Sequence, residues 1–191
     1  MAFYYNQSNC IGCKACQTAC KDINGLPVGV LFRHVRDFET GKYPNAGKYH
    51  FAQTCNHCAS PACVAACMTG SFYIADDGTV QQDTSLCDGC KSCITACPYE
   101  IPQYWEAYNK VAKCNACIEL RGIGEPPACV AGCIMRILEF GEMSELTARH
   151  SSETLTKDLP ILPDSSRTSP NTIIKARPCA LEKDFREHMY V

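Results

Sequence analysis

Cysteine is distributed along this chain in a way that constrains its fold more than any other feature. The sequence has 17 cysteines in 191 residues. Sixteen of them precede position 134 and fall into four groups of four. The groups are Cys10, Cys13, Cys16 and Cys20; Cys55, Cys58, Cys63 and Cys67; Cys87, Cys90, Cys93 and Cys97; and Cys114, Cys117, Cys129 and Cys133. Any fold of this chain must therefore place sixteen thiols in defined sets.

The spacing within the groups indicates iron–sulfur clusters. Cys-x2-Cys-x2-Cys-x3-Cys occurs whole in the first and third groups, and the third ends in Cys97-Pro98. This is the ligand run of bacterial ferredoxins that carry two clusters. Sixteen thiolates are enough for four [4Fe-4S] clusters at four ligands each. Small residues between the ligands, such as Gly12 and Gly89, would let backbone N–H groups approach the cluster sulfurs. The count predicts an electron-conducting protein.

Two other uses of cysteine compete with this interpretation. A cysteine content of about 9% is also typical of disulfide scaffolds, but the odd number, the shared spacing and the absence of a secretory segment before the first group oppose it. Structural zinc often uses Cys-x2-Cys pairs. The ferredoxin spacing of the first and third groups goes beyond what zinc needs. A zinc-binding scaffold remains the alternative from another class, mainly for the fourth group with its wider gap.

Other function classes find little support in the sequence. The net charge of −2 predicts no basic surface for nucleic acid. No apolar run is long enough for a membrane span, and no nucleotide-binding or hydrolase motif is present. His57 lies inside the second group, and imidazole can replace thiolate on iron. Because that group already has four cysteines, we expect His57 beside the site or on the surface. Cys179, outside the groups, is expected to be a free thiol.

The four groups form an internal repeat with predictable local structure. The last two cysteines of each group are four residues apart, which would place them on one face of a helix. In two-cluster ferredoxins the fourth cysteine reaches the other cluster, so the groups should work in pairs. Residues 72–75 and 79–82 predict a hairpin around Asp76-Asp77-Gly78, and 103–107 with 111–113 predict another. Residues 32–38 and 49–54 are further strand candidates. After Gly141 a segment rich in proline and serine predicts disorder, or an arm on another protein.

The whole sequence resembles the iron–sulfur subunit of the dimethyl-sulfoxide-reductase family, the electron-transfer partner of a molybdopterin catalytic subunit. The resemblance covers nearly all 191 residues and includes the order of the four groups. It is carried by the strings CNHCASPAC, CPYEIPQY, KCNACIELRGIGEPPACVAGC, LEFGEMSEL and PNTIIK. The sequence departs from the family where Cys-Pro often ends the second and fourth groups, because it has Cys67-Met68 and Cys133-Ile134 there.

The resemblance implies an α+β fold of two pseudo-symmetric ferredoxin-like modules, each with two [4Fe-4S] clusters, one inserted in the other. The first module would comprise residues 1–48 and 99–140, the inserted module residues 49–98, and an extended C-terminal tail, residues 141–191, would bind a partner. It also implies nested ligand sets, which share cysteines between the first and fourth groups and between the second and third. These sets are Cys10, Cys13, Cys16 and Cys133; Cys114, Cys117, Cys129 and Cys20; Cys55, Cys58, Cys63 and Cys97; and Cys87, Cys90, Cys93 and Cys67.

The function implied is that of a non-catalytic subunit in anaerobic respiration, with no catalytic residues of its own. Electrons would come from a quinol-oxidising membrane anchor or another donor, next to the Cys87 cluster. They would leave from the Cys10 cluster to molybdenum in a large catalytic subunit. The resemblance places the protein at the cytoplasmic membrane, on the periplasmic side through a partner's signal, with the cytoplasm as the alternative. The rival within redox chemistry is a subunit of a formate dehydrogenase or hydrogenase complex.

Overall fold

The N-terminal segment Ala2–Asn6 forms strand β1, the middle strand of a three-stranded sheet. The computed structural model describes residues 1–188. In this sheet β1 pairs antiparallel with β8 (Leu138–Gly141) and parallel with β9 (Thr172–Lys175). Tyr4 faces helix α6 (Met143–Arg149) and packs with Leu146, whereas Phe3 and Tyr5 face the main core. Because both faces are covered, nearly the whole aromatic strand is buried.

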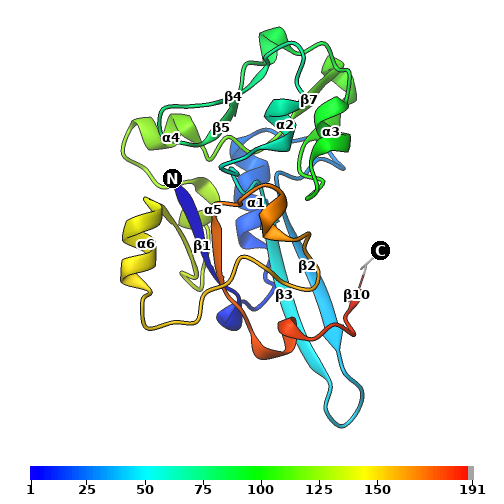
Figure 1. The fold of residues 1–191 in the computed structure, drawn as a ribbon, viewed down its shortest axis with the longest axis vertical. Coiled ribbons are helices and arrows are strands. Elements are labelled where there is room, and N and C mark those ends of the chain that lie inside the picture. The colour runs from blue at the N-terminus through cyan, green and yellow to red at the C-terminus, as the bar shows by residue number, and fades with distance from the viewer. Residues whose placement is uncertain (189–191) are drawn as a thin grey trace.

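A second sheet is built on a long hairpin. Strands β2 (Arg33–Thr40) and β3 (Gly47–Thr54) pair antiparallel from Arg33–Thr54 to Thr40–Gly47. Strand β10 (Arg186–His188) adds to the outer edge of β2. Figure 1 shows the tip of the hairpin projecting away from the rest of the molecule. The strands predicted over 32–38 and 49–54 are confirmed.

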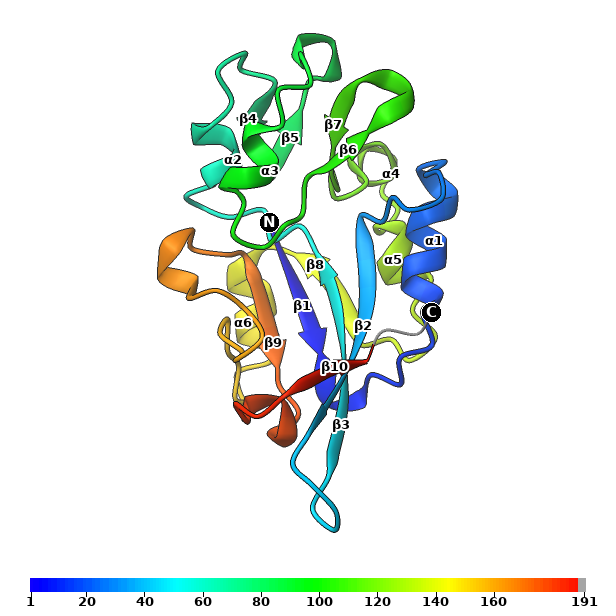
Figure 2. The ribbon, with the colours of Figure 1, turned by 90° about the vertical axis from the view of Figure 1, so that its right-hand side faces the viewer.

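Two short hairpins and two short helices form an upper lobe (Figure 2). Strands β4 (Phe72–Ile74) and β5 (Val80–Gln82) flank the Asp-Asp-Gly turn, and β6 (Gln103–Trp105) pairs with β7 (Lys110–Ala112). Both predicted hairpins are therefore confirmed. Helices α2 (Ala62–Ala65) and α3 (Ser92–Ala96) pack beside them. Short 3-10 turns elsewhere cover Gln7–Asn9, Thr84–Leu86, Glu106–Tyr108, Ser165–Arg167 and Pro178–Leu181.

The helices that carry cysteines are shorter than the four-residue spacing predicts. Only α1 (Ala15–Ile23) contains both of its group's last two cysteines, Cys16 and Cys20. Helices α2 and α5 (Ala128–Ala131) span four residues each, so Cys67 and Cys133 follow after the helix has ended. Cys97 is the C-terminal cap of α3, in extended conformation. Helix α4 (Ile118–Gly122) follows directly after Cys117. The prediction that the last two cysteines of each group share one face of a helix is therefore confirmed for α1 and is wrong for the other three groups.

The division into two modules stays a prediction, and one of its boundaries lies within a strand. The boundary at residue 48 falls inside β3, which forms one continuous hairpin with β2. The β6–β7 hairpin belongs to the predicted first module, and its Val111 packs with Phe72, Val80 and Cys63 of the upper lobe. Hairpin pairing and apolar contacts, rather than the cysteine groups, decide where these segments lie.

The segment after residue 141 differs from the expected extended tail. Its strand β9 hydrogen-bonds to β1 over four residue pairs, and Ile174 is 1% exposed. Leu159, from the proline-rich stretch, is buried in the main core. Hydrogen bonds join the backbone of Ala59 and Ser60 to residues 168–169. These contacts make the segment part of the protein's own core, because the edge of β1 presents backbone N–H and C=O groups with which a further strand can pair.

Candidate iron–sulfur sites

The first cavity joins cysteines from opposite ends of the cysteine-rich region. It is lined by Cys10, Cys13 and Cys16 of the first group and by Cys133 of the fourth. Apolar side chains such as Tyr5 and Leu138 form most of the remaining wall, and Lys14 also lines it. The cavity encloses about 330 Å³ not filled by protein atoms, part of it open to solvent. Packing of α1 against α5, which precedes Cys133, brings these segments together.

The second cavity joins the second and third groups in the same way. It is lined by three cysteines of the second group and by the last cysteine of the third, with about 360 Å³ unfilled by protein atoms. These are Cys55, Cys58, Cys63 and Cys97. Thr168, from the C-terminal segment, also lines the cavity, and burial raises the pKa of Cys58 while a hydrogen bond with Thr168 opposes this effect. The C-terminal segment therefore contributes directly to this site.

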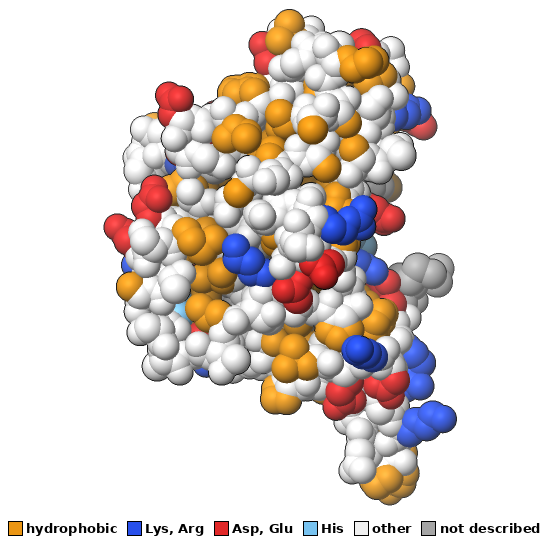
Figure 3. Space-filling view, in the orientation of Figure 1, with side chains coloured by type: hydrophobic (Ala, Val, Ile, Leu, Met, Phe, Trp, Pro, Cys, Tyr) orange, Lys and Arg blue, Asp and Glu red, His pale blue; other side chains and the backbone are white. Residues whose placement is uncertain are grey.

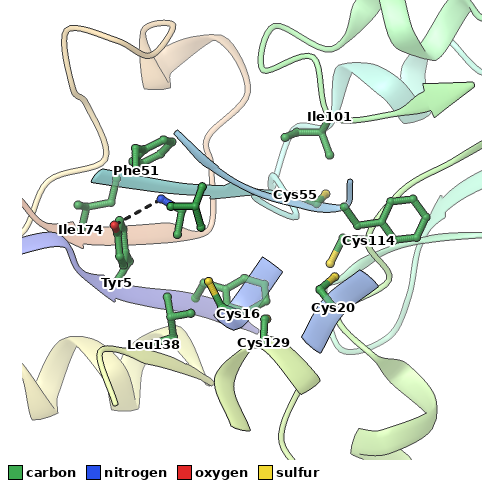
Figure 4. Close-up of a cluster of buried hydrophobic side chains, with 14 of the residues drawn as sticks. Tyr5, Cys16, Cys20, Phe51, Cys55, Ile101, Cys114, Cys129, Leu138 and Ile174 are labelled. Atoms are coloured by element: carbon green, nitrogen blue, oxygen red, sulfur yellow. Dashed lines mark hydrogen bonds between the residues drawn. The ribbon is translucent and has the colours of Figure 1, made fainter. Parts of the chain in front are cut away.

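Most of the other eight cysteines lie near one another in two regions, around Cys20 and around Cys93. Burial raises the pKa of Cys20, and the neighbouring thiols of Cys114, Cys129 and Cys117 add to the effect. Burial likewise raises the pKa of Cys93 to about 12, with contributions from Cys63, Cys67 and Cys87. Cys90 is exposed, and its backbone N–H donates to Asp88 at 3.1 Å. Figure 4 shows Cys20, Cys114 and Cys55 in succession across the core.

The donor chemistry of these sites fits iron–sulfur clusters. Each cavity presents four thiols and mostly apolar walls, which is the ligand set of a [4Fe-4S] cluster. Within residues 1–188, no three cysteine, histidine or acidic side chains lie close enough to hold a single metal ion. The thiols stand apart around the cavity walls instead. Burial raises the pKa of Cys16 to about 11 and of Cys55 to about 12, so metal binding must displace their protons.

Two glycines give the first and third groups the same loop conformation. Gly12 and Gly89 have φ angles of +68° and +77°, and the lysine two residues later is also left-handed in each loop. A Cβ on Gly12 would lie 2.4 Å from the His50 ring, and a Cβ on Gly89 would lie 2.4 Å from the Asn109 carbonyl oxygen. Both positions therefore require glycine for conformation and for space. The sequence predicts small residues between the ligands, but it does not indicate that His50 and Asn109 lie against them.

Two buried cations beside the thiols were missed in the sequence. Arg33 is 2% exposed, and its Nη1 donates to the Ala52 carbonyl at 2.9 Å. Lys113 is 5% exposed, and its Nζ donates to the carbonyls of Val80 and Cys114. Period-two alternation along the 32–38 strand places Arg33 on the same face as buried Val35, which was the available signal.

His57 and Cys179, the two residues considered besides the sixteen grouped cysteines, both contact other parts of the protein. His57 is buried, and its Nδ1 accepts a hydrogen bond from the Val80 N–H at 3.1 Å. Burial lowers the pKa of His57 well below its usual value. It therefore lies beside the second site and not on the surface. Cys179 is a free thiol, packed against Gly47 at the start of β3.

Comparisons with known proteins agree with this chemistry. Residues 47–143 match the family model of the 4Fe-4S dicluster domain, and residues 1–22 match that of a 4Fe-4S binding domain. The B chain of the anaerobic dimethyl sulfoxide reductase of Escherichia coli K12 is 37% identical over 181 residues, covering 91% of this sequence and 87% of that protein. Its counterpart of the same name in Haemophilus influenzae Rd is 34% identical with the same coverage.

A relative from a dehydrogenase has similar identity. The B subunit of the sulfite dehydrogenase of Allochromatium vinosum is 34% identical, covering 76% of this sequence and 70% of that protein.

Across residues 1–188, none of the helices combines the length and the apolar character needed to cross a bilayer. With its cysteine sets, its ferredoxin-type domains and relatives that match it over most of their length, this protein belongs to the family of iron–sulfur electron-transfer subunits of dimethyl sulfoxide reductases.

Proposed function

We propose that this protein relays electrons through four [4Fe-4S] clusters held by sixteen cysteines in nested sets. The observation that carries the proposal is the composition of the two cavities. Each combines the first three cysteines of one group with the last cysteine of a distant group, as in ferredoxins with two clusters. The four ligand sets are Cys10, Cys13, Cys16 and Cys133; Cys20, Cys114, Cys117 and Cys129; Cys55, Cys58, Cys63 and Cys97; and Cys67, Cys87, Cys90 and Cys93.

The clusters would supply the redox chemistry, and the protein would supply position and environment. Mostly apolar residues line the cavities, and the buried cations Arg33 and Lys113 lie near the thiols. No acid, base or nucleophile is needed for such a relay. The pterin-bound molybdenum of a large catalytic subunit would be one terminus, and a quinol-oxidising membrane subunit or another donor the other. The relatives named as dimethyl sulfoxide reductase chains support this assignment over a formate dehydrogenase, a hydrogenase or a zinc-bound scaffold.

Exposed apolar residues beside the end clusters support docking at both termini. Cys13 and Cys90 are the exposed cysteines, one in each terminal set. Ile134 follows Cys133 and is 63% exposed, whereas Met68 follows Cys67 and is 88% exposed. These are the positions where the family often has proline. Figure 3 shows further apolar side chains over the upper lobe. We assign the Cys10 end to the catalytic subunit and the Cys87 end to the donor, on the periplasmic face of the membrane through the partner's signal.

Metal content is the direct test of the cluster count. Anaerobically purified protein should contain about sixteen iron atoms, at four per cluster, and the visible absorbance typical of iron–sulfur proteins. Fully loaded protein with about four to eight iron atoms and matching zinc would contradict the proposal.

The nested pairing is tested by one ligand substitution. Cys133→Ser should remove or convert the EPR signal of the Cys10, Cys13 and Cys16 cluster, although these residues are more than 100 positions away in the sequence. Cys179→Ser is the matched control, because it removes a thiol outside the four sets, and all four signals should persist. A Cys133→Ser signal loss that maps to the Cys114 cluster would refute the pairing.

The direction of the relay is tested at the other end. Cys90→Ser should abolish electron transfer from the physiological donor to the catalytic subunit. Turnover with a small artificial donor that acts directly on the catalytic subunit should largely persist. If both activities fall together in an intact, iron-loaded complex, electrons do not arrive at this cluster.

A further inference from the structure

Arg33, the first residue of β2, is a buried cation with unused hydrogen-bond donors. Its side chain is buried, Nη1 donates to the Ala52 carbonyl, and a hydrogen bond between the guanidinium and the Cys129 thiol opposes the burial that raises the pKa of that thiol. Among residues 1–188, the Nε and Nη2 atoms have no partner that meets the normal geometry of a hydrogen bond. Burying a charged group and leaving donors unpaired both cost free energy. A guanidinium in this state therefore indicates further acceptors, beyond those that the protein atoms provide.

The surroundings of Arg33 show where those acceptors would lie. No carboxylate of residues 1–188 forms a salt bridge with Arg33, and the Phe3 ring lies 5.2 Å from its central carbon. Burial lowers the pKa of Arg33, but the surrounding thiols outweigh it and raise the pKa overall. The thiols responsible are Cys129, Cys16, Cys114 and Cys20.

These thiols belong to two different ligand sets. Cys16 belongs to the set with Cys10, whereas Cys20, Cys114 and Cys129 belong to the set that we assign to the neighbouring cluster. Both sets are built across α1, which carries Cys16 and Cys20 one turn apart. Arg33 lies next to α1 on β2, which packs against that helix. Its charge is therefore positioned to act on both sites at once.

We propose that Arg33 is a shared tuning residue, which donates its free N–H groups to sulfur atoms of the two adjacent clusters and raises the reduction potentials of both. This inference rests on the proposed function, because it requires clusters in these two sets. Each reduction adds one electron to a cluster, supplied by the donor through the relay, and Arg33 exchanges no proton because guanidinium stays protonated. A fixed positive charge in a buried site stabilises the more negative, reduced form.

The other buried cation provides an internal contrast. Lys113 lies at the second cavity, but its ammonium group already donates to two backbone carbonyls. Arg36 lies three residues after Arg33 on the same strand, is partly exposed and pairs with Glu187 through two hydrogen bonds. Arg36→Gln therefore removes a positive charge from β2 without touching the thiols, and it is the matched control.

The test is a redox titration of the four clusters by EPR in the iron-loaded protein within its complex. Arg33→Met should lower the equilibrium constant for reduction of the Cys10 and Cys114 clusters at least tenfold. This corresponds to a fall of about 59 mV in each midpoint potential for one electron. Arg33→Lys keeps the charge and should retain most of the wild-type potential. The other two clusters, and all four in Arg36→Gln, should be unchanged. Unchanged potentials in Arg33→Met, a shift of one cluster alone, or an equal shift of all four would overturn the proposal.

A second measurement requires no variant. Wild-type protein labelled with [15N]arginine should show nitrogen hyperfine coupling on the reduced signals of the Cys10 and Cys114 clusters in pulsed EPR. Absence of this coupling would overturn the contact between Arg33 and the clusters, even if Arg33→Met fails to fold. A wild-type protein that lacks four cluster signals would instead refute the proposed function, so the two failures are distinguishable.

Discussion

Gly132 lies where α1 packs against α5, the two helices that hold cysteines of the first and fourth groups. Its backbone is right-handed helical, with φ −75° and ψ −4°, so any residue could adopt it. A Cβ there would nevertheless lie 2.7 Å from the Ala19 Cβ and 3.1 Å from the Ala128 carbonyl oxygen. Carbon atoms in contact normally stay about 3.5–4.0 Å apart. Gly132→Ala must therefore push α1 from α5 by about 1 Å.

Overpacking of this kind costs about 1–3 kcal/mol. For a protein of this size each kcal/mol lowers the unfolding temperature by roughly 2–4 °C, so we expect a fall of about 2–12 °C. The displacement also separates Cys16 and Cys20 from Cys129 and Cys133, so the EPR signals of the two clusters across α1 should weaken first. The assay is anaerobic thermal unfolding by circular dichroism, with iron content and EPR of the same samples.

Two variants separate steric overlap from other causes. Gly122→Ala lies at the end of helix α4, where an added Cβ meets no atom within 4 Å, and it should be neutral or stabilising by up to about 1 kcal/mol. Ala19→Gly combined with Gly132→Ala removes the nearest colliding carbon and should restore the iron content. If Gly132→Ala unfolds at the wild-type temperature with full iron, the contact between α1 and α5 is not as tight as we infer.

Three further predictions concern strand β9, the hydrogen bonds of Lys113 and the carboxylate of Asp77. A variant ending at residue 150 lacks β9 and should lose its iron, whereas a variant ending at residue 182 lacks only β10 among the strands and should keep it; iron per purified molecule decides this. Lys113→Met leaves the carbonyls of Val80 and Cys114 without their donor and should lower the free energy of unfolding by about 2–3 kcal/mol, measured by denaturant titration. Burial tends to raise the pKa of Asp77, but hydrogen bonds from Thr79 and Arg121 outweigh it and lower this pKa from 3.8 to about 2. The ionised carboxylate therefore stabilises the folded protein above pH 3.8, and this stabilisation is lost as the pH falls toward 2. The difference in unfolding temperature between wild type and Asp77→Asn should therefore be full at pH 7 and shrink below about pH 4; a constant difference would contradict the assignment.

Local features of this protein were readable from the sequence because they depend on neighbouring residues. The ligand loops follow from cysteine spacing, with Gly12 and Gly89 where the backbone must turn left-handed. The β4–β5 hairpin follows from its Asp-Asp-Gly turn. The residues alone indicated that the cysteine groups work in pairs. Which group pairs with which came from the family resemblance, because spacing within a group does not say whether Cys133, Cys97 or another distant cysteine completes a ligand set.

The tertiary structure decided the features that depend on residues far apart. The segment after residue 141 has the composition of a disordered arm, yet β9 pairs with β1 across about 170 residues of sequence. An open sheet edge supplies hydrogen bonds that composition does not reveal, and Leu159 and Ile174 then fill the core. Arg33 likewise reads as an ordinary strand cation. Only the folding of α1 and β2 against each other surrounds it with thiols from the first and fourth groups, because charge and burial combine in space and not along the sequence.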